Sequence, residues 1–166
     1  SDYIQMIKYK TAVLLGSSLK MGGIINDVNE TDLESLYDIG INLGLAFQIQ
    51  DDYLDLFGDQ NLIGKKIGGD IIKRKKTVMY HVFKEISNEG DSLTLDQLYN
   101  DSNSDDGSKI QKVFELFKNA NVDVKTKDLV KNYSTKAINS LENINIENDK
   151  KSELIQICNK LISRDF

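Results

Sequence analysis

The sequence lacks proline and tryptophan, and it holds one cysteine and one histidine among 166 residues. Without proline, no residue breaks a helix by removing a backbone donor. The single cysteine, Cys158, excludes an internal disulfide, and we expect a reducing, cytoplasmic location. Cys158 falls in an apolar helical pattern and is predicted to lie in the core. A zinc site of His and Cys ligands is excluded, because one residue of each type cannot build it.

Long hydrophobic runs and a strong excess of positive charge are also absent. No stretch of 18 or more apolar residues occurs, so we expect no transmembrane helix. The net charge of −5 gives no basic field, and we expect no nucleic-acid partner. With 40% hydrophobic and 28% charged residues, the composition is that of a globular chain, and its length fits one domain.

Apolar residues recur at helical spacing along most of the chain, and no alternating pattern is long enough for a sheet. The sequence therefore predicts an all-α fold. Thr31 with Glu34 and Ser108 with Gln111 have the spacing of capping boxes, and Gly58 is expected to end a helix. The predicted helices span residues 2–25, 31–57, 71–87, 95–99, 108–119, 125–144 and 150–162.

The segment 39–49 is apolar on every side of a helix, so we expect it to be buried. Gly40 and Gly44 lie four residues apart in it, and this spacing favours close approach of a neighbouring helix. Three carboxylates, Asp51, Asp52 and Asp55, follow directly. Helical spacing places them on one side, near the negative end of the helix dipole, where like charges repel. A hard cation such as Mg²⁺ would relieve this, although a solvated helix end is the simpler interpretation.

A Gly-rich loop and a basic cluster follow the carboxylates. Residues 65–76 hold six Lys and Arg side chains and one acid, Asp70. A solvated basic face or a nucleic-acid contact is an alternative, but the neighbouring carboxylates would repel phosphodiesters. A metal-bridged phosphate uses both features, because the acids hold Mg²⁺ and the lysines neutralise the remaining charge.

In its order and spacing, the whole set resembles the C-terminal half of a trans-isoprenyl diphosphate synthase of the polyprenyl synthetase family. The matching pieces are Lys10-Thr11, residues 47–55 (FQIQDDYLD), Gly64-Lys65, Gly68-Gly69-Asp70, and Lys75 with Thr77. This resemblance implies an all-α helical bundle of the isoprenoid synthase type around a deep cavity. Residues 1–166 would be the C-terminal part of that domain, without its N-terminal helices.

The resemblance also implies a Mg²⁺-dependent prenyltransferase that condenses an allylic diphosphate with isopentenyl diphosphate in isoprenoid biosynthesis. By the same resemblance the intact protein would be a homodimer. The second aspartate-rich motif would be Asp51, Asp52 and Asp55, with Asp51 as the expected direct Mg²⁺ ligand. The substrate-binding residues implied are Lys10, Thr11, Gln48, Lys65 and Lys75, with Lys66 as the alternative to Lys65. Of these, Lys10 and Thr11, together with Asp51 and Asp52, are implied to be catalytic.

The sequence departs from the family in lacking a first aspartate-rich motif and the basic motifs for isopentenyl diphosphate. Asp105-Asp106 does not replace that motif, because it comes later and in a polar loop. Family members have about twice this length, so we expect the chain to have little activity alone. The alternatives are a non-catalytic subunit that binds a partner chain and a class I terpene cyclase, but the glycine-lysine elements favour chain elongation.

Overall fold

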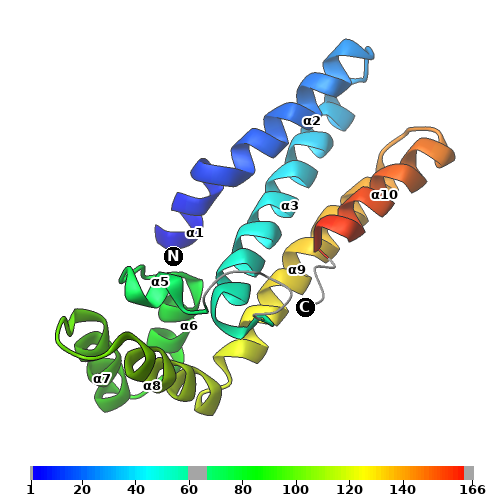
Figure 1. Ribbon diagram of the computed structural model, residues 1–166. Helices are drawn as coiled ribbons and strands as arrows, with labels where there is room; N and C mark the ends of the chain where they lie inside the picture. The colour runs from blue at the N-terminus through cyan, green and yellow to red at the C-terminus, as the bar shows by residue number, and fades with distance from the viewer. Residues whose placement is uncertain (1, 60–66, 163–166) are drawn as a thin grey trace. The chain divides into compact units, whose positions relative to one another are not determined.

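The structure is a computed structural model that describes residues 2–59 and 67–162, and every regular element in these ranges is helical. The predicted all-α fold is therefore confirmed, and none of the described helices is long and apolar enough to cross a membrane. The elements (Figure 1) are α1 (Asp2–Ile7), the π-helix η1 (Lys8–Ala12), α2 (Val13–Ile25), α3 (Glu30–Phe57), α5 (Gly69–Ile72), α6 (Val78–Ile86), α7 (Glu89–Asn100), α8 (Asp106–Asn119), α9 (Val122–Asn143) and α10 (Asn148–Ile162).

The chain forms two compact units, divided near Gln50 and again near Leu129. In the first unit, α2, α3, α9 and α10 share one hydrophobic core (Figure 1). Cys158 is 3% exposed in this core, as its apolar surroundings in the sequence predicted. The other buried members of the core are Leu36, Ile39, Leu43, Ala137, Leu141 and Ile144.

Two glycines of α3 let the preceding helical segment approach with no side chain between the backbones. A Cβ added to Gly40 would lie 2.5 Å from the Cα of Gly16, and one added to Gly44 would lie 2.5 Å from the Cα of Ala12. Real Cβ atoms do not reach such distances, so only glycine fits at either position. The close helix approach predicted from the spacing of the two glycines is confirmed.

The residues that cap α3 and α8 differ from those predicted. Asn29 accepts the N–H of Asp32 at 3.0 Å and donates its amide to the Asp32 carboxylate at 2.8 Å. Asp105 caps α8 by accepting the N–H of Ser108 at 3.0 Å. Both predicted capping boxes are therefore wrong, by two and three residues. Asn and Asp caps are at least as favourable as Thr and Ser, and each lies just before the predicted cap.

In the second unit, the phenyl rings of Phe83 on α6 and Phe117 on α8 pack with centroids 5.5 Å apart. The helix predicted over residues 71–87 is two helices, because α5 ends at Ile72 and α6 begins at Val78. Arg74 between them has a φ of +55°, a left-handed conformation that stops a helix. Helix α7 is longer than its predicted core of residues 95–99, since Asn88 caps it through the N–H of Asp91.

Candidate functional site

Lys10 and Thr11 lie in η1, a π-helical turn within an otherwise α-helical run. The Thr11 hydroxyl donates to the Oε1 atom of Gln48 at 3.0 Å, across 37 residues of sequence. The contact between Gly44 and Ala12 seats η1 against α3, one turn before Gln48. The structure thus brings Thr11 and Gln48 together beside the exposed Lys10, while the π turn itself had no signal in the sequence. Such turns are frequent at functional sites.

The three carboxylates of α3 have three different environments. Asp51 is exposed, Asp52 is 4% exposed, and Asp55 is half-buried. The three side chains were predicted to share one side of the helix, and along that helix their exposures differ. Within residues 2–59 and 67–162, no group of three or more His, Cys, Asp or Glu side chains has an arrangement suited to a metal ion. The predicted metal roles of these residues stay predictions.

Asp55 accepts two hydrogen bonds from the N-terminal end of α5. Its backbone oxygen accepts the N–H of Gly68 at 2.6 Å, and its Oδ2 atom accepts the N–H of Asp70 at 2.9 Å. Burial is the main cause of the raised pKa of Asp55, and the charges of Asp70 and Asp51 add to it. The N–H of Asp70 and the charge of Lys75 oppose the rise.

Asp70 and Lys75 form an ion pair next to Asp55. The Lys75 Nζ atom lies 2.5 Å from the Asp70 Oδ1 atom, and the Lys75 N–H donates to the Asp70 backbone oxygen at 2.8 Å. The hydrogen bond that Lys75 donates to the Asp70 carboxylate raises the pKa of Lys75, although partial burial opposes the rise. Sequence reasoning proposed Lys75 but no role for Asp70, whose only signal was its place in the Gly-Gly-Asp element. Lys65 and Lys66 lie outside the described residues.

A second polar cluster, which the sequence analysis missed, joins α6 to α7. Tyr80 and Lys84 both donate to the Asp96 carboxylate, Lys84 at 2.8 Å. The Nζ atom of Lys76 lies 5.1 Å from the centroid of the Tyr80 ring, a cation–π contact. Burial and Asp96 raise the pKa of Tyr80 to about 12. The cluster anchors the far end of the turn that carries Lys75.

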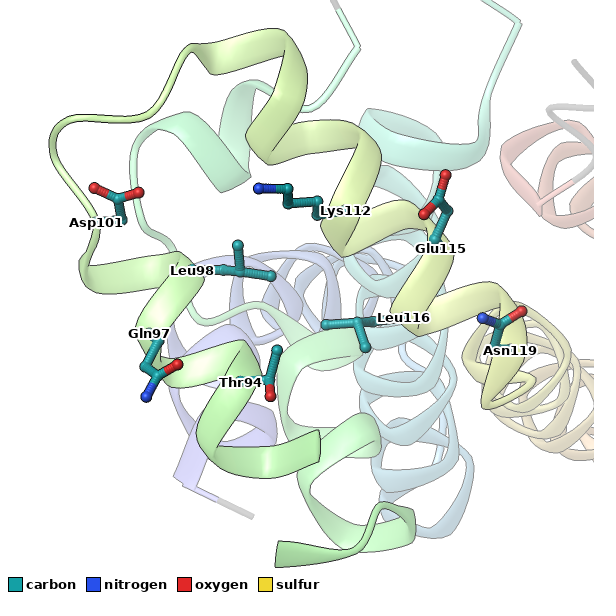
Figure 2. A pocket seen from close by; sticks show the side chains of 8 residues that line it. All are labelled: Thr94, Gln97, Leu98, Asp101, Lys112, Glu115, Leu116 and Asn119. Carbon is teal, nitrogen blue, oxygen red and sulfur yellow. The ribbon is translucent and has the colours of Figure 1, made fainter. Parts of the chain in front are cut away.

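Figure 2 shows a pocket between α7 and α8, with Leu98 and Leu116 at its apolar floor. Its volume is about 590 Å³, and it includes no residue that the sequence predicted for the site. Its remaining lining is polar: Thr94, Gln97, Asp101, Lys112, Glu115 and Asn119. The pocket lining therefore shares no residue with the groups described around Thr11 and Asp55.

The helical fold is that of the isoprenoid synthases, and the comparisons with known proteins identify the family. Residues 1–117 match the polyprenyl synthetase family, and the chain belongs to it. It is 36% identical to geranylgeranyl diphosphate synthase of Saccharolobus solfataricus over 89% of its length and 44% of that protein.

Two solved structures extend the similarity. A geranylgeranyl pyrophosphate synthase is 38% identical, with a TM-score of 0.89 over 99% of this chain and 51% of its own. A polyprenyl synthase from Caulobacter crescentus, complexed with calcium and isoprenyl diphosphate, is 27% identical, with a TM-score of 0.85 over 99% of this chain and 49% of its own. The chain spans about half the length of the curated relatives it matches.

Proposed function

We propose that the chain is the C-terminal part of a trans-isoprenyl diphosphate synthase, and that the intact synthase condenses an allylic diphosphate with isopentenyl diphosphate. The observation that carries the proposal is the hydrogen-bonded set of Asp55, Asp70 and Lys75. It joins the aspartate motif of α3 to the lysine expected to bind the diphosphate. The relatives, named as geranylgeranyl and short-chain synthases, support the same reaction class.

The donors near the end of α3 fit Mg²⁺ in chemistry, because all are carboxylate oxygens. Mg²⁺ commonly takes one or two protein carboxylates and completes its shell with water and substrate phosphates. One exposed carboxylate, Asp51, therefore suffices as a protein ligand without a three-carboxylate cage. When bound, the ion would stabilise the negative charge of the leaving diphosphate.

The cationic side chains would neutralise the charge that remains on the diphosphate. Lys75 presents an ammonium whose pKa is raised, so it stays protonated at neutral pH. Lys10 and Lys65 are further proposed diphosphate contacts, and Thr11, whose hydroxyl donates to Gln48 at 3.0 Å, is proposed to act at the reacting carbon. These groups bind and orient the leaving group, and an apolar surrounding would keep water from the allylic cation.

Activity of the chain alone is a separate proposal. The relatives are about twice as long, so we propose that residues beyond this segment complete the active site. From the family resemblance we also propose that the intact protein is a cytoplasmic homodimer. Little turnover is expected from the chain by itself, and robust turnover by monomeric protein would contradict this. A non-catalytic role as a partner-binding subunit is disfavoured, because the acidic and basic set is retained.

Calorimetric titration with geranyl diphosphate and Mg²⁺ tests the proposal, with the chain alone and with the remaining half of the synthase added. Asp51→Ala should abolish the metal-dependent heat. Asp38→Ala is the matched control, because Asp38 is an exposed carboxylate earlier on the same helix. Equal binding by the two variants would refute the metal role of Asp51.

A further inference from the structure

Asp55 differs in its contacts from the other carboxylates of its motif. We propose that Asp55 is a positioning residue, which holds Asp70 and through it sets the place of the Lys75 ammonium. The inference rests on the proposed function, since Lys75 is taken to bind a diphosphate. It gives Asp55 a mechanical role in place of the metal ligation that its motif implied.

Asp55 binds the start of α5 through two hydrogen bonds. Its backbone oxygen and its Oδ2 atom accept N–H groups from two residues of the same turn, Gly68 at 2.6 Å and Asp70 at 2.9 Å. Gly68 has a φ of +77°, and a Cβ there would lie 2.7 Å from the Ile110 side chain. The turn is therefore fixed from both sides, by Asp55 and by α8.

The next contact joins Asp70 to Lys75. Asp70 binds Lys75 twice, through its backbone oxygen at 2.8 Å and its carboxylate at 2.5 Å. Both the backbone and the ammonium of Lys75 thus depend on where Asp70 lies. Since the Lys75 side chain is 55% exposed, no enclosing core replaces this hold.

The Asp55 carboxylate is poorly placed to serve a metal at the same time. One oxygen, Oδ2, accepts the Asp70 N–H, and the other, Oδ1, lies 3.2 Å from where a Gly69 Cβ would be. Both oxygens thus face the α5 turn. Asp51, one helical turn earlier, is exposed and suits the metal better.

The discriminating variants are Asp55→Asn and Asp55→Ala. The asparagine amide oxygen can still accept the Asp70 N–H, whereas alanine removes the acceptor. A positioning role predicts that Asp55→Asn retains diphosphate affinity within about twofold, while Asp55→Ala loses about tenfold, the value of one charge-assisted contact. A metal ligand would be weakened in both variants, because the neutral amide oxygen binds Mg²⁺ less strongly than a carboxylate does.

The binding experiment titrates geranyl diphosphate at several Mg²⁺ concentrations into the full chain, supplemented with the remaining half where binding requires it. The double variant Asp55→Ala/Lys75→Ala should bind no more weakly than Lys75→Ala alone, since both changes remove one interaction. The Mg²⁺ midpoint should stay constant in Asp55→Asn and rise in Asp51→Asn. Additive losses, or a raised midpoint in Asp55→Asn, would overturn the positioning role.

Amide hydrogen exchange of the full chain provides a readout that needs no ligand. Asp55→Ala should remove protection at the Asp70 and Lys75 amides, Asp55→Asn should keep it, and Asp38→Ala should leave it unchanged. Unchanged protection in Asp55→Ala would overturn the inference whatever the binding data show. Absence of any Mg²⁺-dependent binding by the wild type, with the exchange pattern as expected, would instead overturn the proposed function.

Discussion

The key helix contacts inside the first unit and inside the second unit differ in kind. In the first, α2 and η1 approach α3 backbone to backbone at Gly16, Ala12 and the glycines of α3, and the hydrogen bond from Thr11 to Gln48 adds to this contact. In the second, α3 and α5 are joined through Asp55 and Asp70, and Asp70 in turn binds Lys75 in the segment before α6. Packing of bare backbones tolerates no added atom, whereas an exposed ion pair tolerates change but holds weakly. The first contact sets the scaffold, and the second leaves charged groups available to a ligand.

Gly40→Ala is the strongest test of the backbone contact. The new methyl group would lie 2.5 Å from the Gly16 backbone, so we expect a loss of about 3 kcal/mol in the free energy of unfolding, measured with urea. Gly22→Ala is the matched control, because nothing lies within 4 Å of its Cβ position. This exposed helical site should gain about 0.5 kcal/mol. Equal stability of the two variants would contradict the contact.

Asp96→Asn tests a polar contact of the second unit, with an expected loss of about 1–2 kcal/mol in unfolding free energy. Hydrogen bonds from Lys84 and Tyr80 hold the pKa of Asp96 below its usual range. The stabilisation is therefore complete above the unfolded pKa of about 3.9 and is lost as the pH falls through the lower folded value. The gap between wild type and variant should be constant from pH 5 to 7 and shrink below about pH 4. A gap independent of pH would refute the ionic contribution.

Lys75→Ala separates the held ammonium from its exposed basic neighbours. We expect about tenfold weaker binding of geranyl diphosphate with Mg²⁺, because one charge-assisted contact is lost. Lys73→Ala is the comparison, since Lys73 is exposed two residues earlier. It should change affinity by less than about twofold. Equal losses would mean that only the total charge of the cluster matters.

Asp105→Ala gives the smallest expected effect and sharpens the assignment of the α8 cap. Loss of the Asp105 side chain leaves the Ser108 N–H without its acceptor, at a cost of about 1 kcal/mol in unfolding free energy. Ser108→Ala, at the cap that the sequence favoured, should cost only a few tenths of that. A larger loss of unfolding free energy in Ser108→Ala than in Asp105→Ala would favour Ser108 as the cap.

The sequence predicted best where one strong local signal decided the structure. Gly58 follows the last residue of α3, and the Gly40 and Gly44 spacing predicted the close helix contact. The prediction from sequence failed where a single residue has a non-helical backbone conformation. Arg74 is an example, because no composition rule predicts its left-handed backbone. The partner of Thr11 was on the predicted list as Gln48, but Asp70 was not, because its contacts join residues 5 and 15 positions away.

The π turn at Lys8–Ala12 also makes the direction of the Thr11 side chain depend on the number of residues in this segment. A π turn holds an extra residue relative to an α turn, so side chains before it are out of phase with those after it by about 100°. Deleting one residue there would restore regular α spacing and rotate Thr11 away from Gln48. The presence of one additional amino acid, whatever its identity, is thus what aims the Thr11 hydroxyl.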